Sequence, residues 1–380
     1  MNGRRLVLVL GLLAALAVWL QWRVPEPPAV AGAGSDSVAA LLRDRQDNQG
    51  YARVLGPRPF HFPQDHAAHP AFRHEWWYVT GQIKAPAGRW FGFQATFFRF
   101  ALSPVAQTSA SAWRSQQALL AHFALTDVAG QTFNAHERRA RASHGLAGAE
   151  VDRPAVWVDD WSLRQRTTDG SWELEMTSDQ ATLSLQLTPT QAPVLQGDRG
   201  YSQKSAAAGN ASHYYSLPQL ETRGTLRLDG ETLAVSGQSW LDHEWGTSAL
   251  GDAQRGWDWF AIHLDDGRAL TFYRLRQRDG QTDPHSRGVL VAADGSSTDL
   301  GADAVEMRPL RWWVSPRTAA RYPVQWRVSV PSQGLQFDLN AVLDAQEWAG
   351  DLRYWEGAVL AHSSAGLTGR GYLELTGYSP

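Results

Sequence analysis

The chain has 380 residues, of which 43% are hydrophobic and 19% are charged, enough apolar material for substantial cores in two domains. Its 35 basic and 38 acidic residues give a formal net charge of −3, without the basic surplus that nucleic-acid binding usually requires. The lack of cysteine excludes disulfides, thiolate metal sites, cysteine nucleophiles and a lipoprotein anchor.

The N-terminal segment has the pattern of an export signal. Arg4 and Arg5 precede an apolar run over residues 6–20, and Arg23 follows it. A basic start before a short apolar run is typical of a signal peptide, and the run is short for a membrane span. We therefore predict that residues 1–34 are a signal peptide or an N-terminal membrane anchor with a linker. In either case the rest of the chain is exported: periplasmic, secreted or anchored to the inner membrane.

From residue 51 onward the pattern of side chains predicts antiparallel β-sheet. Apolar and polar residues alternate over 161–165, 172–176 and 183–187, which predicts a three-stranded meander. Asp-Gly pairs, which suit two-residue hairpins because both central positions need positive φ, recur along the chain. They stand at 169–170, 229–230, 266–267, 279–280 and 294–295. We predict an all-β protein whose sheets close into barrels.

A short repeat suggests how the chain is divided. His74-Glu75-Trp76 recurs as His243-Glu244-Trp245, and an aromatic segment follows each copy. We interpret the repeat as a duplication, with one barrel in each half of the chain. The alternation is interrupted over residues 206–220, where Ala, Gly, Asn and Ser gather. The predicted domains are therefore 35–220 and 221–380.

Longer aromatic motifs make a family resemblance specific. They are Gly56-Pro57-Arg58-Pro59-Phe60, Glu75-Trp76-Trp77-Tyr78, Trp240-Leu241-Asp242-His243-Glu244-Trp245-Gly246, Gly256-Trp257-Asp258-Trp259-Phe260, Tyr354-Trp355-Glu356-Gly357 and Gly371-Tyr372-Leu373-Glu374-Leu375. With these motifs the chain resembles, from about residue 51 onward, the lipocalin-like family of the carotenoid 1,2-hydratases (hydroxyneurosporene synthases) and AttH-type proteins. The resemblance implies two lipocalin-like β-barrels packed together, with an apolar cavity. It also implies a lipid-handling ABC transporter of the inner membrane as a candidate partner.

Acid-catalysed hydration of an isoprenoid double bond is the chemistry that the resemblance implies. It needs a proton donor, aromatic faces that stabilise a cation, and one held water. Side chains alternate along a strand, so His243 and Trp245 face one side while Asp242 and Glu244 face the other. On a cavity wall, His243 could protonate the alkene. The alternative is that the two acids brace arginines on the barrel exterior and that His243 is a hydrogen-bonded core residue.

The resemblance also points to Tyr273. Hydratases of the family carry an Asp two residues after this Tyr, whereas Leu275 stands there in this chain. Asp258, between two tryptophans, can take the place of that proton donor. The candidate catalytic residues are therefore His243, Asp258 and Tyr273.

Eighteen tryptophans are many for a chain of this length, and they indicate large apolar cavities or stacked aromatic walls. The predicted ligand-binding residues are Trp76, Trp77, Trp245, Trp257, Trp259 and Trp355. Four carboxylates are predicted to be structural: Glu75, paired with Arg73 or Arg99, and Asp242, Glu244 and Glu356. His66, His69 and His74 do not form a known metal-binding motif, and we predict neither a metal nor a cofactor.

These features leave three functional hypotheses. The first is an exported protein that binds a long apolar ligand, such as a lipid, an isoprenoid or a carotenoid-like molecule, between aromatic walls. The second is a hydro-lyase that adds water to an isoprenoid double bond, similar to carotenoid 1,2-hydratase. The third is a module that docks on a membrane transporter. The Trp excess and the missing carboxylate at position 275 favour the first.

Overall fold

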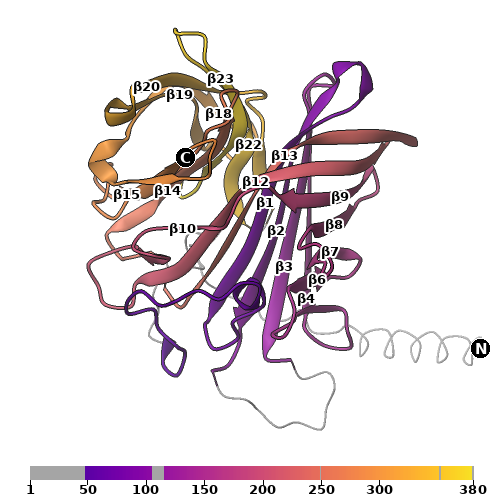
Figure 1. The fold of residues 1–380 in the computed structure, drawn as a ribbon, viewed down its shortest axis with the longest axis vertical. Coiled ribbons are helices and arrows are strands. Elements are labelled where there is room, and N and C mark those ends of the chain that lie inside the picture. Colours follow the sequence, from indigo (N-terminus) through magenta and orange to yellow (C-terminus); the bar gives the residue numbers. More distant parts are fainter. Residues whose placement is uncertain (1–47, 105–114, 249, 351, 379–380) are drawn as a thin grey trace, which may run out of the picture. The chain divides into compact units, whose positions relative to one another are not determined.

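The structure is a computed structural model that describes residues 48–104, 115–248, 250–350 and 352–378, all within one compact unit of the chain. In these ranges the chain forms two antiparallel β-sheets and four short 3-10 helices (Figure 1). The helices are η2 (Gln64–His66), η3 (Pro86–Gly88), η4 (Ala302–Ala304) and η5 (Pro331–Gln333). Among the described residues, no helix has the length and apolarity to cross a membrane. The predicted signal or anchor over residues 1–34 lies outside the described residues.

The first sheet runs from β1 to β13. Its strands are β1 (His74–Lys84), β2 (Trp90–Ala101), β3 (Gln117–Asp127), β4 (Thr132–Arg141), β5 (Ala147–Ala149), β6 (Ala155–Val158), β7 (Trp161–Gln165), β8 (Trp172–Thr177), β9 (Ala181–Pro189), β10 (Val194–Leu195), β11 (Tyr201–Gln203), β12 (Ala211–Leu228) and β13 (Glu231–Gly246). They pair in the order β4-β3-β2-β1-β13-β12-β9-β8-β7-β6-β5, and β10 and β11 also pair with β12.

The second sheet runs from β14 to β23. Its strands are β14 (Gln254–Leu264), β15 (Ala269–Gln277), β16 (Arg287–Val291), β17 (Ser297–Leu300), β18 (Glu306–Val314), β19 (Arg321–Val330), β20 (Leu335–Ala341), β21 (Glu347–Ala349), β22 (Arg353–His362) and β23 (Thr368–Leu375). They pair in the order β17-β16-β15-β14-β23-β22-β20-β19-β18, with β21 on β22, and curl into a ring in Figure 1. The predicted fold, two antiparallel barrels, is confirmed, with one barrel nearly closed and the other a half-barrel.

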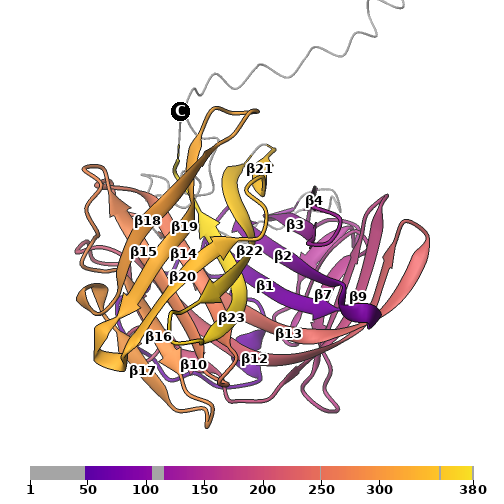
Figure 2. The ribbon, with the colours of Figure 1, turned by 90° about the horizontal axis from the view of Figure 1, so that it is seen from above.

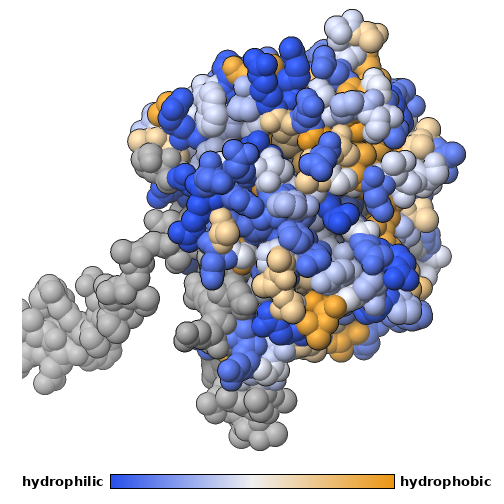
Figure 3. Space-filling view, turned by 90° about the vertical axis from the view of Figure 1, so that its left-hand side faces the viewer, coloured by the Kyte–Doolittle hydropathy of each residue, from blue (hydrophilic) through white to orange (hydrophobic). Residues whose placement is uncertain are grey.

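Local sequence accounts for much of this architecture. The predicted meander is β7, β8 and β9, and alternate residues of β8 are buried. Asp229 and Gly230 both have positive φ and join β12 to β13 directly, as an Asp-Gly hairpin requires. On the face drawn in Figure 3, hydrophilic residues surround smaller apolar groups, because one side of many strands meets water.

Tertiary pairing changes the interpretation of the His-Glu-Trp repeat. Both copies lie in the first sheet, on the neighbouring antiparallel strands β1 and β13, where Glu75 pairs with Trp245 and Trp76 with Glu244. The copies are therefore cross-strand neighbours, and they do not mark one barrel each.

The division between the sheets also differs from the predicted boundary at residue 220. That position lies inside β12, and the second sheet begins with β14 at Gln254. The polar, glycine-containing segment near residue 206 is a loop, but the two long strands that follow it return to β1 and β9 of the first sheet. A break in alternation marks a turn, and it does not show which sheet the next strand joins.

The two sheets meet where β1 and β2 lie against β22 and β23 (Figure 2). Each sheet encloses an apolar core of its own, and a third cluster, which includes Tyr78, Trp259 and Tyr372, lies between them. The sheets approach closely at Gly92 of β2, where a Cβ would stand 2.5 Å from the Cβ of Ala358 on β22. A small residue at each position therefore sets the distance between the sheets.

Gly92→Ala is expected to destabilise the protein by about 1–3 kcal/mol, because the added methyl group overlaps Ala358 and forces the sheets apart. Urea denaturation of the variant and of the wild type measures this difference. Ala358→Gly in the Gly92→Ala background should restore part of the loss by removing the atom that clashes. A double variant no more stable than Gly92→Ala alone would contradict this explanation.

Candidate active site between the two sheets

The β1–β13 pair presents two chemically different faces. Residues that pair across antiparallel strands point to the same side, and successive residues alternate sides. Trp76 and Tyr78, with Glu244 and Asp242 opposite them, therefore face the second sheet. The side chains of Trp77 and His243 point the other way, into the core of the first sheet.

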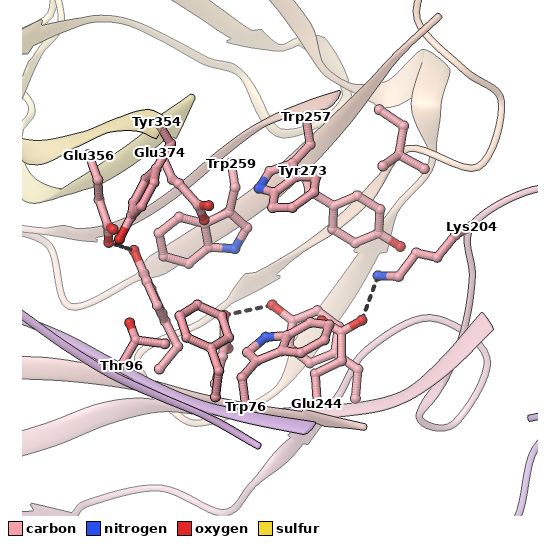
Figure 4. A pocket seen from close by; sticks show the side chains of 15 residues that line it. Trp76, Thr96, Lys204, Glu244, Trp257, Trp259, Tyr273, Tyr354, Glu356 and Glu374 are labelled. Atoms are coloured by element: carbon pink, nitrogen blue, oxygen red, sulfur yellow. Dashed lines mark hydrogen bonds and ion pairs between the residues drawn. The ribbon is translucent and has the colours of Figure 1, made fainter. Parts of the chain in front are cut away.

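A pocket of about 80 Å³ lies on the face that looks toward the second sheet (Figure 4). About 10–15 Å³ of such space holds one water, so the pocket has room for several. The first sheet and the β11–β12 segment contribute Trp76, Tyr78, Thr96, Phe98, Lys204, Tyr214, Asp242 and Glu244. The second sheet contributes Trp257, Trp259, Tyr273, Leu275, Tyr354, Glu356 and Glu374. Aromatic rings and carboxyl groups therefore face each other across it.

On the second sheet, four lining residues form one row across four strands. Tyr273 of β15 pairs with Trp259 of β14, Trp259 pairs with Glu374 of β23, and Glu374 pairs with Glu356 of β22. Cross-strand partners share a face, so the register by itself brings two carboxyl groups together at one end of the row. The hydroxyl of Tyr273 stands at the other end, with the indole of Trp259 between.

Glu356 is buried and Glu374 is partly buried, and two neighbouring carboxyl groups in such surroundings cannot both be ionised at low cost. Burial, followed by the neighbouring Glu374, raises the pKa of Glu356 well above its ordinary value. Burial raises the pKa of Glu374 to about 8, against a hydrogen bond from Trp257 that lowers it. The hydroxyl of Tyr78 donates to Glu356 Oε1. At neutral pH this pair carries protons that it can donate.

Asp242 faces the pair from the first sheet and has an intermediate acidity. Burial raises its pKa to about 7, although hydrogen bonds from Ser216, Tyr214 and Trp240 stabilise the ionised form and lower it. The Tyr214 hydroxyl and the Trp240 indole N–H each donate to it at 2.6 Å. Near neutral pH, Asp242 is divided between the acid and its carboxylate, so it can accept a proton.

A buried ammonium group closes the other end of the pocket. Lys204 Nζ lies 3.0 Å from Glu244 Oε1 and 2.9 Å from Ser202 Oγ. Burial alone would lower the pKa of Lys204, but the charge of Glu244 and the nearby Tyr273 raise it, so the amine stays protonated. Ser202 Oγ in turn lies 2.8 Å from the Tyr273 hydroxyl.

On the opposite face of β1 and β13, a polar cluster is buried in the first sheet. Glu75 accepts hydrogen bonds from Arg99 Nε at 2.8 Å, His69 Nδ1 at 2.8 Å and His243 Nε2 at 2.9 Å. Burial opposes the charge of Glu75, but Arg99 and the two histidines lower its pKa well below the ordinary value. Burial lowers the pKa of His243 to about 4, although Glu75 raises it, so this ring is neutral at pH 7.

Among the described residues, His69, Glu75 and His243 bring three potential metal ligands within 4.8 Å of one another. Two observations argue against a cation there. Arg99, itself buried, already neutralises Glu75, and its charge would repel a metal ion. The carboxylate also accepts the backbone N–H of His69, so its oxygens are satisfied by the protein. The cluster is therefore best explained as a structural ion pair with its hydrogen-bond donors.

The structure does not bring the three candidate catalytic residues together. His243 points into the first sheet and stacks on Trp77, with ring centroids 4.6 Å apart. Asp258 points into the second sheet, where Arg274 lies at 2.6 Å and the Tyr378 hydroxyl at 2.9 Å. Of the three, Tyr273 alone lines the pocket.

The predicted ligand-binding tryptophans divide in the same way. Trp76, Trp257 and Trp259 line the pocket, whereas Trp77 and Trp245 lie in the first core and Trp355 lies in the second. Alternation along each strand explains the split, because a neighbour of a lining residue must face away.

The four acids that we predicted to be structural have different surroundings. Glu75 pairs with Arg99, one of its two predicted partners. Asp242, Glu244 and Glu356 line the pocket, and their polar contacts are hydroxyls, an indole and an ammonium group, not arginines on an exterior. Sequence reasoning missed Glu374, Tyr78, Tyr214, Tyr354 and Lys204. The sequence offered one signal for Glu374. In the last motif it stands two residues after Tyr372, so the two side chains lie on the same face of a strand.

Comparison with known proteins gives the family. The AttH-like family model matches residues 53–378, most of the chain. The chain belongs to the AttH-like family. A solved structure of a provisionally assigned AttH from Nitrosomonas europaea is 38% identical, with a TM-score of 0.78 over 86% of this chain and 99% of that one.

Two further similarities are to kievitone hydratases. The structure of the enzyme from Nectria haematococca has a TM-score of 0.65 at 16% identity, covering 88% of this chain and 97% of that one, which shows a shared fold. The sequence of kievitone hydratase from Fusarium solani subsp. phaseoli is 26% identical over 153 residues, 37% of this chain. The matched region spans 40% of that relative's length.

Proposed function

We propose that this protein is a hydratase that adds water to a carbon–carbon double bond by acid catalysis in the pocket between the two sheets. The observation that carries the proposal is the Glu356–Glu374 pair in the pocket lining, which faces Asp242 and three tryptophans. Burying carboxyl groups is costly. A pocket that only held an apolar chain would gain nothing from several of them.

The groups around the pocket can divide the reaction among them. The protonated Glu356–Glu374 pair gives its proton to the less substituted alkene carbon, and the π electrons form the new C–H bond. The positive charge then rests on the more substituted carbon, where the indole faces of Trp76, Trp257 and Trp259 stabilise it. Water forms the C–O bond and gives a proton to Asp242. Return of that proton to the carboxyl pair through water restores the starting state, and the net reaction is alkene plus water to alcohol.

Family and relatives support the same chemistry. Two proteins similar to this chain are named kievitone hydratase, and one of them shares the fold over most of both chains. The resemblance to carotenoid 1,2-hydratases rests on motifs that include Trp257, Trp259, Glu356 and Glu374, all of which line the pocket. The donor that we infer, the Glu356–Glu374 pair, is different from His243 and Asp258.

Binding of an apolar ligand without chemistry is the second candidate function. Trp76, Trp257, Trp259, Phe98 and Leu275 favour it, because together they offer a largely apolar wall. A binding function of this kind would suit an exported protein that works with a membrane transporter. Its export and any membrane anchor would depend on residues 1–34.

The test is hydration itself. Purified protein is incubated with trisubstituted alkenes, which give tertiary cations, in water enriched in ¹⁸O, and mass spectrometry detects an alcohol that carries the label. The donor must be protonated and Asp242 ionised, so the rate should be highest between the pKa values of about 7 for Asp242 and about 8 for Glu374. Above that range the rate should fall about tenfold per pH unit. Tight binding of these alkenes without labelled product at any pH would favour the second candidate.

A further inference from the structure

We propose that the Tyr273 hydroxyl, held by Ser202 and Lys204, binds an uncharged oxygen atom of the substrate, so that the substrate is an alkene carrying a hydroxyl or carbonyl group and not a hydrocarbon. This inference rests on the proposed hydratase function and specifies its substrate class. It assigns a binding role to the end of the pocket that lies opposite the carboxyl pair.

The first support is that this end is built from enclosed polar groups. Ser202, Lys204 and Tyr273 are all less than a tenth exposed. Lys204 Nζ donates to Ser202 Oγ and also lies 4.2 Å from the Tyr273 ring centroid. An ammonium group brought into an aromatic pocket costs free energy unless polar partners compensate. An apolar ligand would leave the polar end of the pocket without a function.

The hydrogen-bond pattern leaves a donor that can face a ligand. Ser202 Oγ accepts a hydrogen from Lys204 and shares one with Tyr273 over 2.8 Å. If the Ser202 hydroxyl donates to Tyr273, the phenolic hydrogen of Tyr273 is not needed within the trio. Tyr273 lines the pocket, so this hydrogen can be donated to an acceptor oxygen there (Figure 4). The adjacent ammonium makes the phenol a stronger donor.

The charges select a neutral oxygen over an anion. Glu244 lies 3.0 Å from Lys204 Nζ and neutralises the single cation of the pocket lining. Asp242, whose pKa is about 7, adds part of a negative charge, and a nearby anion would further oppose the ionisation of Glu356 and Glu374. A carboxylate or phosphate on the substrate would therefore meet net negative potential, whereas an alcohol or a carbonyl would not.

The pairing of the strands also gives an approximate length for the substrate. Tyr273, Trp259 and Glu374 lie on three adjacent strands, so two strand spacings, roughly 10 Å, separate the backbone positions of the oxygen-binding residue and the acid. A chain of two isoprene units, with oxygen at one end and a trisubstituted alkene toward the other, fits that separation.

The test compares citronellol with 2,6-dimethyloct-2-ene, which has the same carbon chain and alkene but no hydroxyl. For the wild type we expect kcat/KM for hydration to be about 100-fold or more higher for citronellol, because a site built for a polar group rejects analogues that lack it. Quenching of tryptophan fluorescence gives the dissociation constants of both compounds, so the preference can be measured apart from turnover.

Variants test which side chains cause the preference for citronellol over the hydrocarbon. Tyr273→Phe should reduce the preference for citronellol to within about tenfold. The double variant Lys204→Met/Glu244→Gln removes the ion pair without leaving a lone charge. It should also weaken the preference for citronellol. Tyr322→Phe is the matched control, since it removes a buried hydroxyl that binds Glu347 away from the pocket, and it should keep the full preference.

The outcomes separate this inference from the proposed function. Equal hydration and equal binding of the two compounds by the wild type would overturn the oxygen site and leave the hydratase intact. The same conclusion follows if Tyr273→Phe keeps the full preference. Oxygen-dependent binding without hydration of either compound would support the site and count against the hydratase.

Discussion

Glu374→Gln and Glu356→Gln are each expected to lower the rate of alkene hydration by about 10²- to 10⁴-fold, the usual contribution of a positioned general acid. An amide keeps the shape of the carboxyl group but cannot supply its proton. Because both acids are largely protonated near neutral pH, the free energy of unfolding should change little. Single-turnover rates and urea denaturation measure the two effects separately.

The carboxyl pair should behave as one unit. The double variant is expected to be scarcely slower than either single variant, since each already removes the shared proton donor. Glu374→Gln also takes away the neighbouring charge that helps to raise the pKa of Glu356, so any residual activity should decline at a lower pH. Asp338→Asn, which changes a carboxyl paired with Arg327 far from the pocket, is the control. A Glu374→Gln enzyme within threefold of the wild-type rate would remove the pair from the mechanism.

Arg99→Met is expected to cost about 3–5 kcal/mol of stability, because it leaves the carboxylate of Glu75 buried without its countercharge. The guanidinium also donates to the backbone carbonyls of His69 and Phe72, so it ties the segment before β1 to the first sheet. The free energy of unfolding from urea titration at pH 7 gives the loss. Arg327→Met, which breaks an exposed ion pair with Asp338, should cost less than about 1 kcal/mol.

The effect of Arg99→Met should depend on pH in a defined direction. In the wild type the pKa of Glu75 is depressed, so its contribution is present above its unfolded pKa and is lost as pH falls through the folded one. Without Arg99 the folded pKa rises, and at acid pH Glu75 can take up a proton and shed its buried charge. The difference between variant and wild type should therefore shrink from pH 7 toward pH 4. A difference that grows over this range would contradict the assignment.

Several features of the fold followed from local sequence. Alternating apolar residues defined β7, β8 and β9, and Asp229-Gly230 defined a hairpin through its need for positive φ. Alternation by itself also places Asp242 and Glu244 on the opposite face of the strand from His243 and Trp245. It could not show which of these two faces lines a pocket, because both consist of aromatic and ionisable residues.

The site itself was only partly predictable. Trp76, Trp257, Trp259 and Tyr273 were expected near a ligand and do line the pocket, whereas His243 and Asp258 face the two cores. The pairing of Glu356 with Glu374, and the meeting of Lys204 with Tyr273, join residues from strands that are distant in sequence. Motif spacing carries no information about such contacts.

The sequence by itself determined the all-β class, many turns and the family, because strand alternation, Asp-Gly geometry and long aromatic motifs are local properties of the chain. Tertiary structure decided the rest. It set β12 and β13 in the first sheet, turned the acid face of β13 toward the second sheet, and paired Glu356 with Glu374 across neighbouring strands. The physical reason is that register between distant strands selects the neighbours of each side chain, and those neighbours determine its burial and its acidity.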